Sequence, residues 1–352
     1  MTVGTRMQIA GVCHPERPVT RSARLALVLL SLFCGSIFAQ TSPNDYALAE
    51  KLYRSGNLSQ AEPLYLHIAP DSSHYPMAQL RLGTIYYLTA RPALAETRFK
   101  AYLAYRQSPE VYCLLAGAQF NQQKFDEAAL SAHKALRLDQ EFAKAYTVLG
   151  MIHTAEHEWS LAKTDYTKAI KLNPKDADTW FMLGQALYLR NRFAEAARSF
   201  KEALKINPNR VRSYAALARA QDAMGDISGA KQSFQEGIIV SGKEDVFQKD
   251  IYLQYADFLL KLGRLKASQA TVEAALRIAP QDFGLHYELG KVFFRMGRLT
   301  DAAFQEETAL RLDGKNYRVD FLLAQIYTAL RQPKEAARYA ALAVQATPQS
   351  SR

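Results

Sequence analysis

Hydrophobic and small residues recur along the chain with a period of 34 residues. The clearest stretch begins at Ala177 and holds large residues, a Leu-Gly pair and regularly spaced alanines. Its recurring residues are Trp180, Leu183, Gly184, Phe193, Ala196, Phe200, Ala203 and Pro208. Residues of the same kinds precede them by 34 positions, at Tyr146, Leu149, Gly150, Trp159, Ala162, Tyr166, Ala169 and Pro174. Self-similarity at this period indicates a stacked repeat architecture.

The same register extends over almost the whole chain after residue 41 and predicts nine repeats. They span residues 42–75, 76–108, 109–142, 143–176, 177–210, 211–244, 249–282, 283–316 and 317–350, with Asp245–Gln248 as the only insertion. Position seven of each repeat is large, and positions eight and twenty are small. Position twenty, for example, holds Ala61, Ala95, Ala128, Ala162, Ala196, Ala230, Ser268, Ala302 and Ala336.

These residue types predict two helices of about three turns in each repeat, joined by a tight turn. Glycine marks the turn in four repeats, at Gly56, Gly225, Gly263 and Gly297, where a positive φ is expected. Small residues at positions eight and twenty let the paired helices approach closely. Prolines such as Pro174 and Pro208 end the second helix, because proline cannot continue one.

The W-x2-L-G and A-x3-F spacings at this period resemble the tetratricopeptide repeat. The resemblance implies an all-α fold, a right-handed α-solenoid of about nine helix-turn-helix hairpins. One such hairpin cannot cover its own apolar face, so stability would come from stacking on neighbours.

Departures from the pattern fall mainly in the outer repeats. Asp45 and Asp320 occupy position four, and Glu306 stands where an aromatic residue is usual. In the last hairpin Tyr339, Leu342 and Val344 are expected to lie partly bare. We therefore expect a partner, or self-association, at this uncovered C-terminal hairpin.

The N-terminal 39 residues are typical of an export signal. Arg17, Arg21 and Arg24 precede an uncharged apolar run over residues 25–38, and cleavage is expected after Ala39. The run is too short to span a bilayer comfortably. An uncleaved membrane anchor is the alternative. The sequence thus predicts a periplasmic or secreted protein.

Composition restricts the functional classes. The 352 residues are 49% hydrophobic and 22% charged, with a net charge of +10. The predicted signal at residues 1–39 contributes +3 of this charge (four Arg against one Glu), and the remaining 10 − 3 = +7 is spread along the predicted helices without a basic block. This favours weak attraction to anionic surfaces and gives little support to nucleic-acid binding. The repeats occupy residues 42–350 and leave no room for a catalytic domain, so neither enzymatic activity nor a cofactor is predicted.

Two sequence features suggest chemistry but fit the repeat pattern better. His153, Glu156 and His157 match the zinc-protease pattern H-x-x-E-H. In the repeat register, however, His153 takes a core position and His157 takes the turn, so no metal site is predicted. Cys113 has no basic neighbour in sequence to activate it, and we interpret it as a small apolar residue.

The inward face of the first helices is the better candidate site. In proteins that this chain resembles, positions two, five, nine, twelve and thirteen face a concave groove. The predicted partner-binding residues are Tyr53, Tyr87, Phe120, Met151, Phe181, Gln185, Tyr188, Arg219, Tyr287, Lys291, Phe294 and Arg295. Aromatic residues on a groove are plausible anchors for a peptide, although some could instead pack between neighbouring helices.

The leading hypothesis is an exported scaffold that binds a partner protein or peptide in its concave groove. The alternative is a substrate-docking or regulatory subunit of a cell-envelope enzyme complex. The carboxylate clamp for chaperone tails is disfavoured, because no Asn occupies position nine of any repeat.

Overall fold

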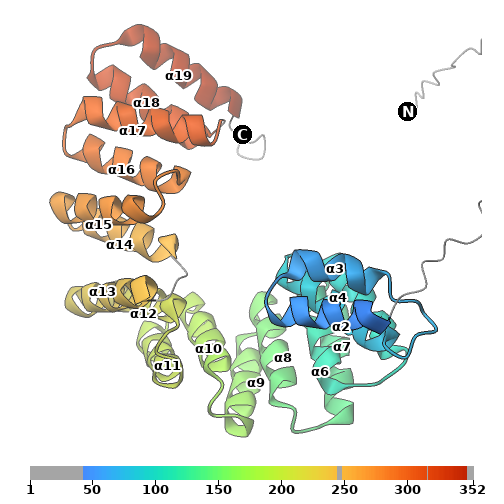
Figure 1. Cartoon of the computed structure of the whole chain (residues 1–352). Helices are drawn as coiled ribbons and strands as arrows, with labels where there is room; N and C mark the ends of the chain where they lie inside the picture. Colours follow the sequence, from blue (N-terminus) through green and yellow to red (C-terminus); the bar gives the residue numbers. More distant parts are fainter. Residues whose placement is uncertain (1–42, 244–247, 315, 347–352) are drawn as a thin grey trace, which may run out of the picture. The chain divides into compact units, whose positions relative to one another are not determined.

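The computed structural model describes residues 43–243, 248–314 and 316–346, which form eighteen helices and no strand (Figure 1). The predicted signal at residues 1–39 and most of the insertion Asp245–Gln248 lie outside these ranges. The helices are α2 (Pro43–Arg54), α3 (Leu58–Leu66), α4 (Tyr75–Leu88), α5 (Pro92–Leu103), α6 (Pro109–Phe120), α7 (Phe125–Leu138), α8 (Ala143–Ala155), α9 (Trp159–Leu172), α10 (Ala177–Leu189), α11 (Phe193–Ile206), α12 (Val211–Ala223), α13 (Ile227–Lys243), α14 (Lys249–Lys261), α15 (Leu265–Ile278), α16 (Phe283–Arg295), α17 (Leu299–Leu312), α18 (Tyr317–Ala329) and α19 (Pro333–Ala346). The all-α helical-repeat fold is confirmed.

A short left-handed turn joins the two helices of every hairpin. The four predicted glycines have φ between +67° and +79°. The other five hairpins place a non-glycine residue at the same repeat position with φ between 55° and 63°; these are Ala90, Gln123, His157, Asn191 and Arg331. The backbone geometry therefore repeats nine times, although glycine supplies it only four times.

Close approach of paired helices depends on the glycine at position eight. A Cβ atom on Gly184 would lie 2.6 Å from Cε1 of Phe200 in the second helix of the same hairpin. A Cβ atom on Gly150 would lie 2.8 Å from Cε1 of Tyr166. Positions eight and twenty-four thus interlock, because the aromatic ring fills the space that the missing side chain leaves.

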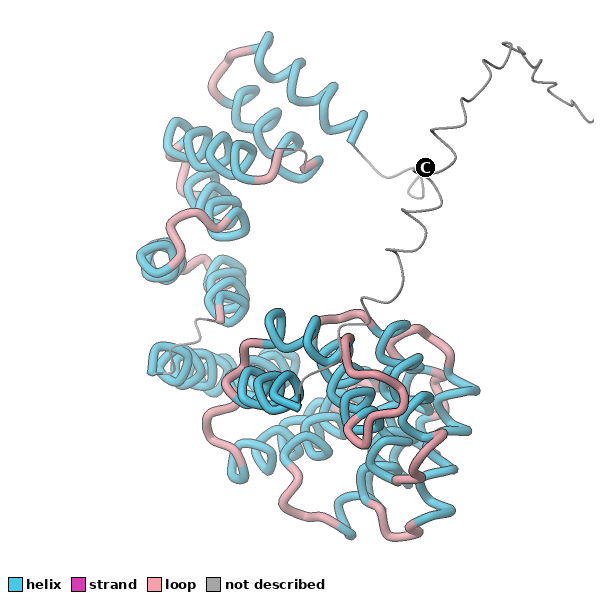
Figure 2. The backbone as a smooth tube through the Cα atoms, turned by 45° about the vertical axis from the view of Figure 1, so that its right-hand side comes forward, coloured by secondary structure: helices cyan, strands magenta, loops and turns pink. Residues whose placement is uncertain are grey.

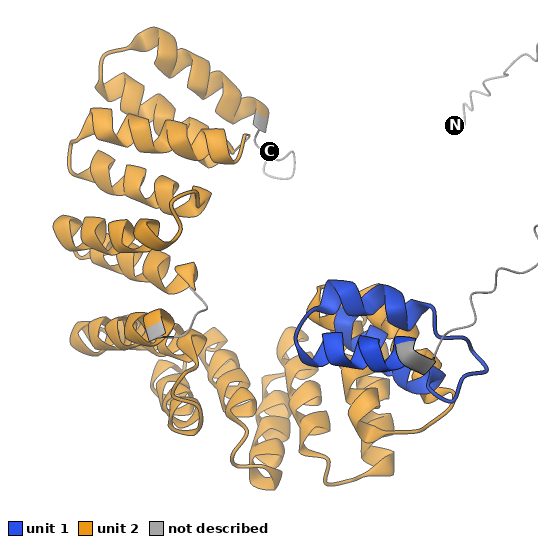
Figure 3. Cartoon of the chain, viewed as in Figure 1, with its two compact units in different colours: residues 1–85 blue, residues 86–352 orange. Residues whose placement is uncertain are grey.

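The chain divides into two compact units, residues 1–85 and 86–352, with the boundary in the last turn of α4 (Figure 3). In the first unit, Glu50 joins all three helices. Its carboxylate accepts hydrogen bonds from Oη of Tyr65 at 2.8 Å and from Nε and Nη2 of Arg81 at 2.8 and 3.2 Å. The guanidinium of Arg81 also lies 4.7 Å from the ring centroid of Tyr53.

In the second unit each second helix packs against the first helix that follows it, as α7 does on α8 and α11 on α12. Figure 2 shows the helices alternating with short loops along the chain. Side chains at the N-termini of several first helices cap the backbone. Asp282, for example, accepts a hydrogen bond from the backbone N–H of Leu285 at 3.1 Å. A continuous apolar core runs from Val211 in α12 to Ile326 in α18.

The last hairpin departs from expectation at one residue. Leu342 and Val344 are 37% and 59% exposed, as expected, but Tyr339 is only 7% exposed. Its ring stacks on that of Tyr327, with centroids 5.6 Å apart and an interplanar angle of 3°. The neighbouring first helix α18 therefore covers Tyr339.

None of the helices within the described ranges has the length and hydropathy of a transmembrane span.

Candidate functional site

A cavity of about 470 Å³ lies on the first helices in the middle of the second unit, and we call it the central cavity. It gathers five of the predicted binding residues, which come from α6, α8, α10 and α12. Its lining is Phe120, Met151, Thr154, Ala155, His157, Tyr166, Met182, Gln185, Ala186, Tyr188, Leu189, Phe200 and Arg219. The predicted members are Phe120, Met151, Gln185, Tyr188 and Arg219.

Two buried aromatic rings form the floor of the central cavity. Tyr166 and Phe200 occupy position twenty-four of their repeats and are each 1% exposed. The Oη atom of Tyr166 lies 3.4 Å from Oγ1 of Thr154, and burial raises the pKa of this phenol above its usual range. Together with the thioethers of Met151 and Met182, these rings give the cavity an apolar surface that an apolar group can contact.

One wall of the central cavity combines an aromatic ring with a cation. The ring of Tyr188 packs against Phe193, with centroids 5.2 Å apart, and the guanidinium of Arg219 lies 4.9 Å from the Tyr188 centroid. Leu189, beside Tyr188, is 63% exposed. An exposed leucine and a stacked arginine at one rim suit a ligand that carries both apolar and acidic groups.

A second cavity of about 460 Å³, the polar cavity, adjoins the central cavity and shares Gln185 and Arg219 with it. It is lined mainly by α10, α12 and the start of α14. Its charged residues include Arg212, Lys249 and Asp250. Lys249 donates to Oδ2 of Asp282 at 2.7 Å, whereas no ion pair of Arg212 is found among the described residues.

Phe181 lines the polar cavity but is only 4% exposed. Its ring packs against Phe200, with centroids 5.6 Å apart, and the guanidinium of Arg210 covers it at 4.5 Å from the centroid. Asp178 in turn pairs with Arg210. The side chain thus belongs mainly to the core between α10, α11 and α12, and a ligand would reach little of it.

Three further predicted residues line a third and larger cavity near the C-terminus, the C-terminal cavity, of about 1160 Å³. Tyr287, Lys291 and Phe294 project there from α16. Lys291 donates to Oε2 of Glu288 at 2.8 Å and lies 4.0 Å from Oδ1 of Asp257.

The remaining predicted residues lie apart from all three cavities. Tyr53 belongs to the first unit, beneath Arg81. Tyr87 is half-buried and packs on Gly117, where a Cβ atom would lie 2.9 Å from its Oη. Arg295 is exposed at the end of α16. The structure therefore groups the predicted residues into separate sites instead of one uniform surface.

The H-x-x-E-H sequence corresponds to two unrelated roles. Nδ1 of His153 lies 2.6 Å from Oδ2 of Asp165 and ties α8 to α9. His157 occupies the left-handed turn with φ of 63°, and its ring faces Trp159 at 5.4 Å between centroids. Within the described ranges no group of three or more metal-ligating side chains is found. Cys113 is 7% exposed, and burial raises the pKa of its thiol to about 12.

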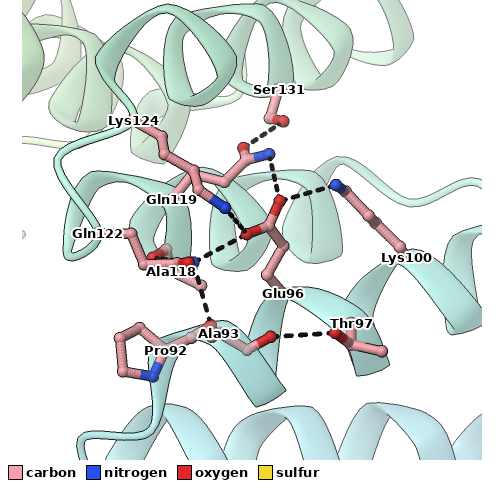
Figure 4. A network of polar contacts seen from close by, with 10 residues as sticks. All are labelled: Pro92, Ala93, Glu96, Thr97, Lys100, Ala118, Gln119, Gln122, Lys124 and Ser131. Carbon is pink, nitrogen blue, oxygen red and sulfur yellow. Dashed lines mark hydrogen bonds and ion pairs between the residues drawn. The ribbon is translucent and has the colours of Figure 1, made fainter. Parts of the chain in front are cut away.

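Glu96 in α5 is a buried carboxylate that accepts hydrogen bonds from several side chains (Figure 4). Its oxygens accept hydrogen bonds from Lys100 at 2.7 Å and from Lys124 and Gln122 at 2.8 Å each. Gln119 adds a bond at 3.3 Å. Burial alone would raise its pKa, but these donors lower the pKa to about 2. The network fastens α5 to α6 and the following turn, and we assign it a structural role.

Several lining residues of the central cavity were not predicted from the sequence. Met182 sits at position six, outside the positions expected to face inward, and Leu189 at position thirteen is neither aromatic nor charged. Tyr166 and Phe200 are recurring large residues of their repeats, and the sequence did not place them at a cavity. Which large residues border a cavity depends on the packing of neighbouring hairpins, which a repeat register alone does not specify.

Comparison with known proteins supports the repeat pattern. Two family models described as tetratricopeptide repeat match the chain, one over residues 150–211, 253–308 and 287–351 and the other over residues 187–239. No curated protein matches the sequence.

Several solved structures are similar to this chain at low identity. The crystal structure of the APC/C hetero-tetramer Cut9-Hcn1 is 15% identical, covers 87% of this chain and 59% of that chain, and has a TM-score of 0.51. A C-terminal part of a TPR repeat-containing protein from Cytophaga hutchinsonii is 20% identical, with 69% and 99% coverage and a TM-score of 0.46. A thermophilic TPR protein in Thermus thermophilus is 23% identical, with 53% and 99% coverage and a TM-score of 0.47. At 15% identity the likeness to the Cut9-Hcn1 structure concerns the helical-repeat fold alone.

Proposed function

Because the chain belongs to the tetratricopeptide repeat family, a family of protein-interaction scaffolds, we propose that it is an exported scaffold whose central cavity binds a segment of a partner protein. The observation that carries this proposal is the convergence of five predicted residues on one apolar cavity. Fold membership alone would not locate the site.

The two adjoining cavities define the chemistry of the bound segment. The central cavity offers Met151, Met182 and Tyr188 to an apolar side chain, and the polar cavity offers Arg212 beside it. Arg219 lines both. A segment with an apolar anchor followed by an acidic residue would satisfy both cavities.

The side chains of the central cavity favour binding over catalysis. Its titratable groups include His157, Tyr166, Tyr188 and Arg219. Within the described residues none of them forms the hydrogen-bonded pair of nucleophile and base that covalent catalysis requires. The supporting chemistry is that of an apolar anchor site with a cationic rim.

Export is the second part of the proposal and rests on the sequence. The basic residues up to Arg24, the apolar run at 25–38 and Ala39 support cleavage. N-terminal sequencing of protein from its native host should start at Gln40 or within a few residues of it. A chain that retains its N-terminus and fractionates with membranes would contradict cleavage and indicate an anchor.

A matched pair of exposed leucines tests the central cavity. Leu189 is 63% exposed and lines the cavity, whereas Leu161 is 50% exposed and lines none of the cavities. A photo-crosslinking amino acid at Leu189, introduced in the native host, should capture a partner that mass spectrometry identifies. The same amino acid at Leu161 should not capture it.

The captured partner then allows an affinity measurement. Leu189→Glu should weaken binding by about tenfold or more, because the substitution places a charge at the apolar anchor site. Leu161→Glu should leave the affinity within about twofold, since it introduces the same charge elsewhere. Equal affinities for both variants, with unchanged helical content, would show that the central cavity does not bind the partner.

A further inference from the structure

The ninth hairpin exposes a face that the preceding hairpins bury. Position twenty-four is at most 2% exposed in the first eight repeats, at Tyr65, Phe99, Ala132, Tyr166, Phe200, Phe234, Val272 and Glu306. In the ninth repeat this position is Ala340, which is exposed. Figure 1 shows α19 at the end of the stack with α18 as its neighbour.

The residue at position five of the first helix is also more exposed in the ninth repeat than in the fifth. Phe181 in the fifth repeat is 4% exposed, whereas Phe321 in the ninth is 59% exposed. The difference has a structural cause. Phe181 lies in a core cluster with Ala216 and Ala220 of the following first helix, α12. The described residues include no helix in the corresponding place beyond α19, so Phe321 and Val344 remain exposed.

The uncovered face is hollow as well as apolar. The C-terminal cavity lies over it and is lined by α16, α18 and α19. The α19 side of the lining is made of small residues, Ala336, Ala337, Ala340 and Ala343, together with Val344. Five of the other repeats place an aromatic ring at the position of Ala340. A covering helix would therefore leave voids unless it supplied bulky side chains itself.

The rim of this cavity is basic. Arg318 is exposed at the start of α18, and its Nε lies 3.3 Å from Oη of Tyr317; no ion pair of Arg318 is found among the described residues. Lys291 lines the same cavity and donates to Oε2 of Glu288 at 2.8 Å, so Arg318 supplies the main cation of the lining. Outside the cavity lining, Lys334 and Arg338 add exposed positive charge on α19 beside one exposed acid, Glu335. A complementary surface would carry carboxylates.

We propose that the ninth hairpin is a second docking site, which binds an acidic amphipathic helix of a partner protein. This helix lies where the first helix of a following repeat would lie. Bulky apolar residues spaced at i, i+4 and i+7 fill the hollow over Ala340, and glutamates face Arg318 and Lys291. The site is separate from the central cavity and does not depend on the function proposed there.

Three fluorescent 16-residue peptides test this proposal by anisotropy. The acidic probe carries leucine and phenylalanine at i, i+4, i+7 and i+11 on a glutamate-rich helix. The second replaces its glutamates with lysines, and the third scrambles the positions of its apolar residues. Only the acidic, correctly spaced probe should bind, and added salt should weaken its binding.

A matched pair of variants on α19 locates the binding surface. Ala340 and Ala341 are both exposed, but only Ala340 lines the cavity. Ala340→Arg should weaken binding of the acidic probe at least tenfold, while Ala341→Arg changes it by less than about twofold. Arg318→Glu should weaken binding of the acidic probe and strengthen binding of the basic one.

Three outcomes would overturn the proposal. The first is equal binding of the acidic and basic probes, and the second is equal loss in Ala340→Arg and Ala341→Arg. The third is a dimer, seen by light scattering, that Ala340→Arg dissociates while the acidic probe fails to bind the wild type. That result would assign the face to a second copy of this chain. Leu189→Glu should leave probe binding unchanged, so failure at this site is distinguishable from failure at the central cavity.

Discussion

Glu306 is expected to make this protein less stable as the pH rises through the neutral range. The residue occupies position twenty-four of the eighth repeat, where Phe200 stands in the fifth. It is 0% exposed, and neither carboxylate oxygen has a hydrogen-bond partner among the described residues. The space opposite it is left by Gly290, onto which the carboxylate packs directly.

Burial sets the protonation state of this carboxyl. It raises the pKa of Glu306 from 4.5 to about 9; the cation of Lys291 lowers the pKa and the carboxylate of Glu288 raises it. Glu288 is itself buried, with a pKa that burial raises, and its Oε2 accepts a hydrogen bond from Lys291. The folded chain therefore holds Glu306 protonated at pH 7.

The sign and size of the pH effect follow from this difference. Below about pH 4.5 both the folded and unfolded chains carry the proton, so Glu306 imposes no titration cost. As the pH rises from 4.5 to 9, only the unfolded chain releases it, and unfolding becomes easier. Between pH 5 and pH 8 the difference is at most about 4 kcal/mol, because one pKa unit corresponds to about 1.4 kcal/mol. Movement of neighbouring side chains reduces this to an expected ~2–3 kcal/mol.

Glu306→Gln isolates the effect, because glutamine has the same shape and does not titrate. The variant should match the wild type at pH 5 and exceed its stability by about 2–3 kcal/mol at pH 8. Repeat arrays unfold locally, so the measurement is hydrogen exchange of amides in α16, α17 and α18 at both pH values. The exposed Glu335→Gln serves as the control and should change neither. Identical pH dependence in Glu306→Gln and wild type would refute the reasoning.

The remaining predictions concern packing, a carboxylate network and a thiol. Gly184→Leu should cost roughly 1–3 kcal/mol, because the new side chain collides with Phe200, and faster hydrogen exchange in α10 and α11 would reveal it. Glu96→Gln should cost about 1–2 kcal/mol at pH 7, measured by urea unfolding. That cost should vanish as the pH falls from about 4.5 to 2. The lowered pKa of Glu96 stabilises the folded chain fully above this range, and protonation removes the stabilisation within it. Cys113 should react with maleimide only after unfolding, as an absorbance assay with and without urea would show.

The sequence predicted the fold well because its strongest constraints are local and recur. The turns within the hairpins show why the sequence did not predict every residue with positive φ. The glycines at Gly56 and Gly225 indicate a residue with positive φ. Gln123 and Asn191 adopt the same conformation, although no glycine in the sequence indicates it there. Stacking of the adjoining helices holds these residues there at a modest conformational cost.

The candidate site was less predictable because exposure depends on the neighbouring hairpin. Phe181 and Phe321 share one repeat position and one residue type, yet they are 4% and 59% exposed. A register assigns both to the inward face, whereas the side chains of the next helix determine which one a ligand can reach. Leu189 and Met182 likewise line the central cavity because of how the neighbouring helices pack, which the repeat register does not show.

The contact between His153 and Asp165 has equivalents in other hairpins, where a glutamine and a serine form it. Gln119 accepts a hydrogen bond from Ser131 at 2.7 Å, and Gln221 accepts one from Ser233 at 2.6 Å. These pairs join positions eleven and twenty-three across their hairpins. His153 and its partner Asp165 occupy the same two positions.

Glutamine should therefore replace His153 at little cost, because its amide can donate to the carboxylate of Asp165. His153→Gln is expected to change the free energy of unfolding by less than about 1 kcal/mol. His153→Leu should cost about 2 kcal/mol more than that, since the half-buried carboxylate of Asp165 would lose its donor. Urea unfolding at pH 7 with and without a chelator measures both. If histidine instead held zinc here, the chelator would destabilise the wild type and both substitutions would be equally harmful, which would contradict the structural role.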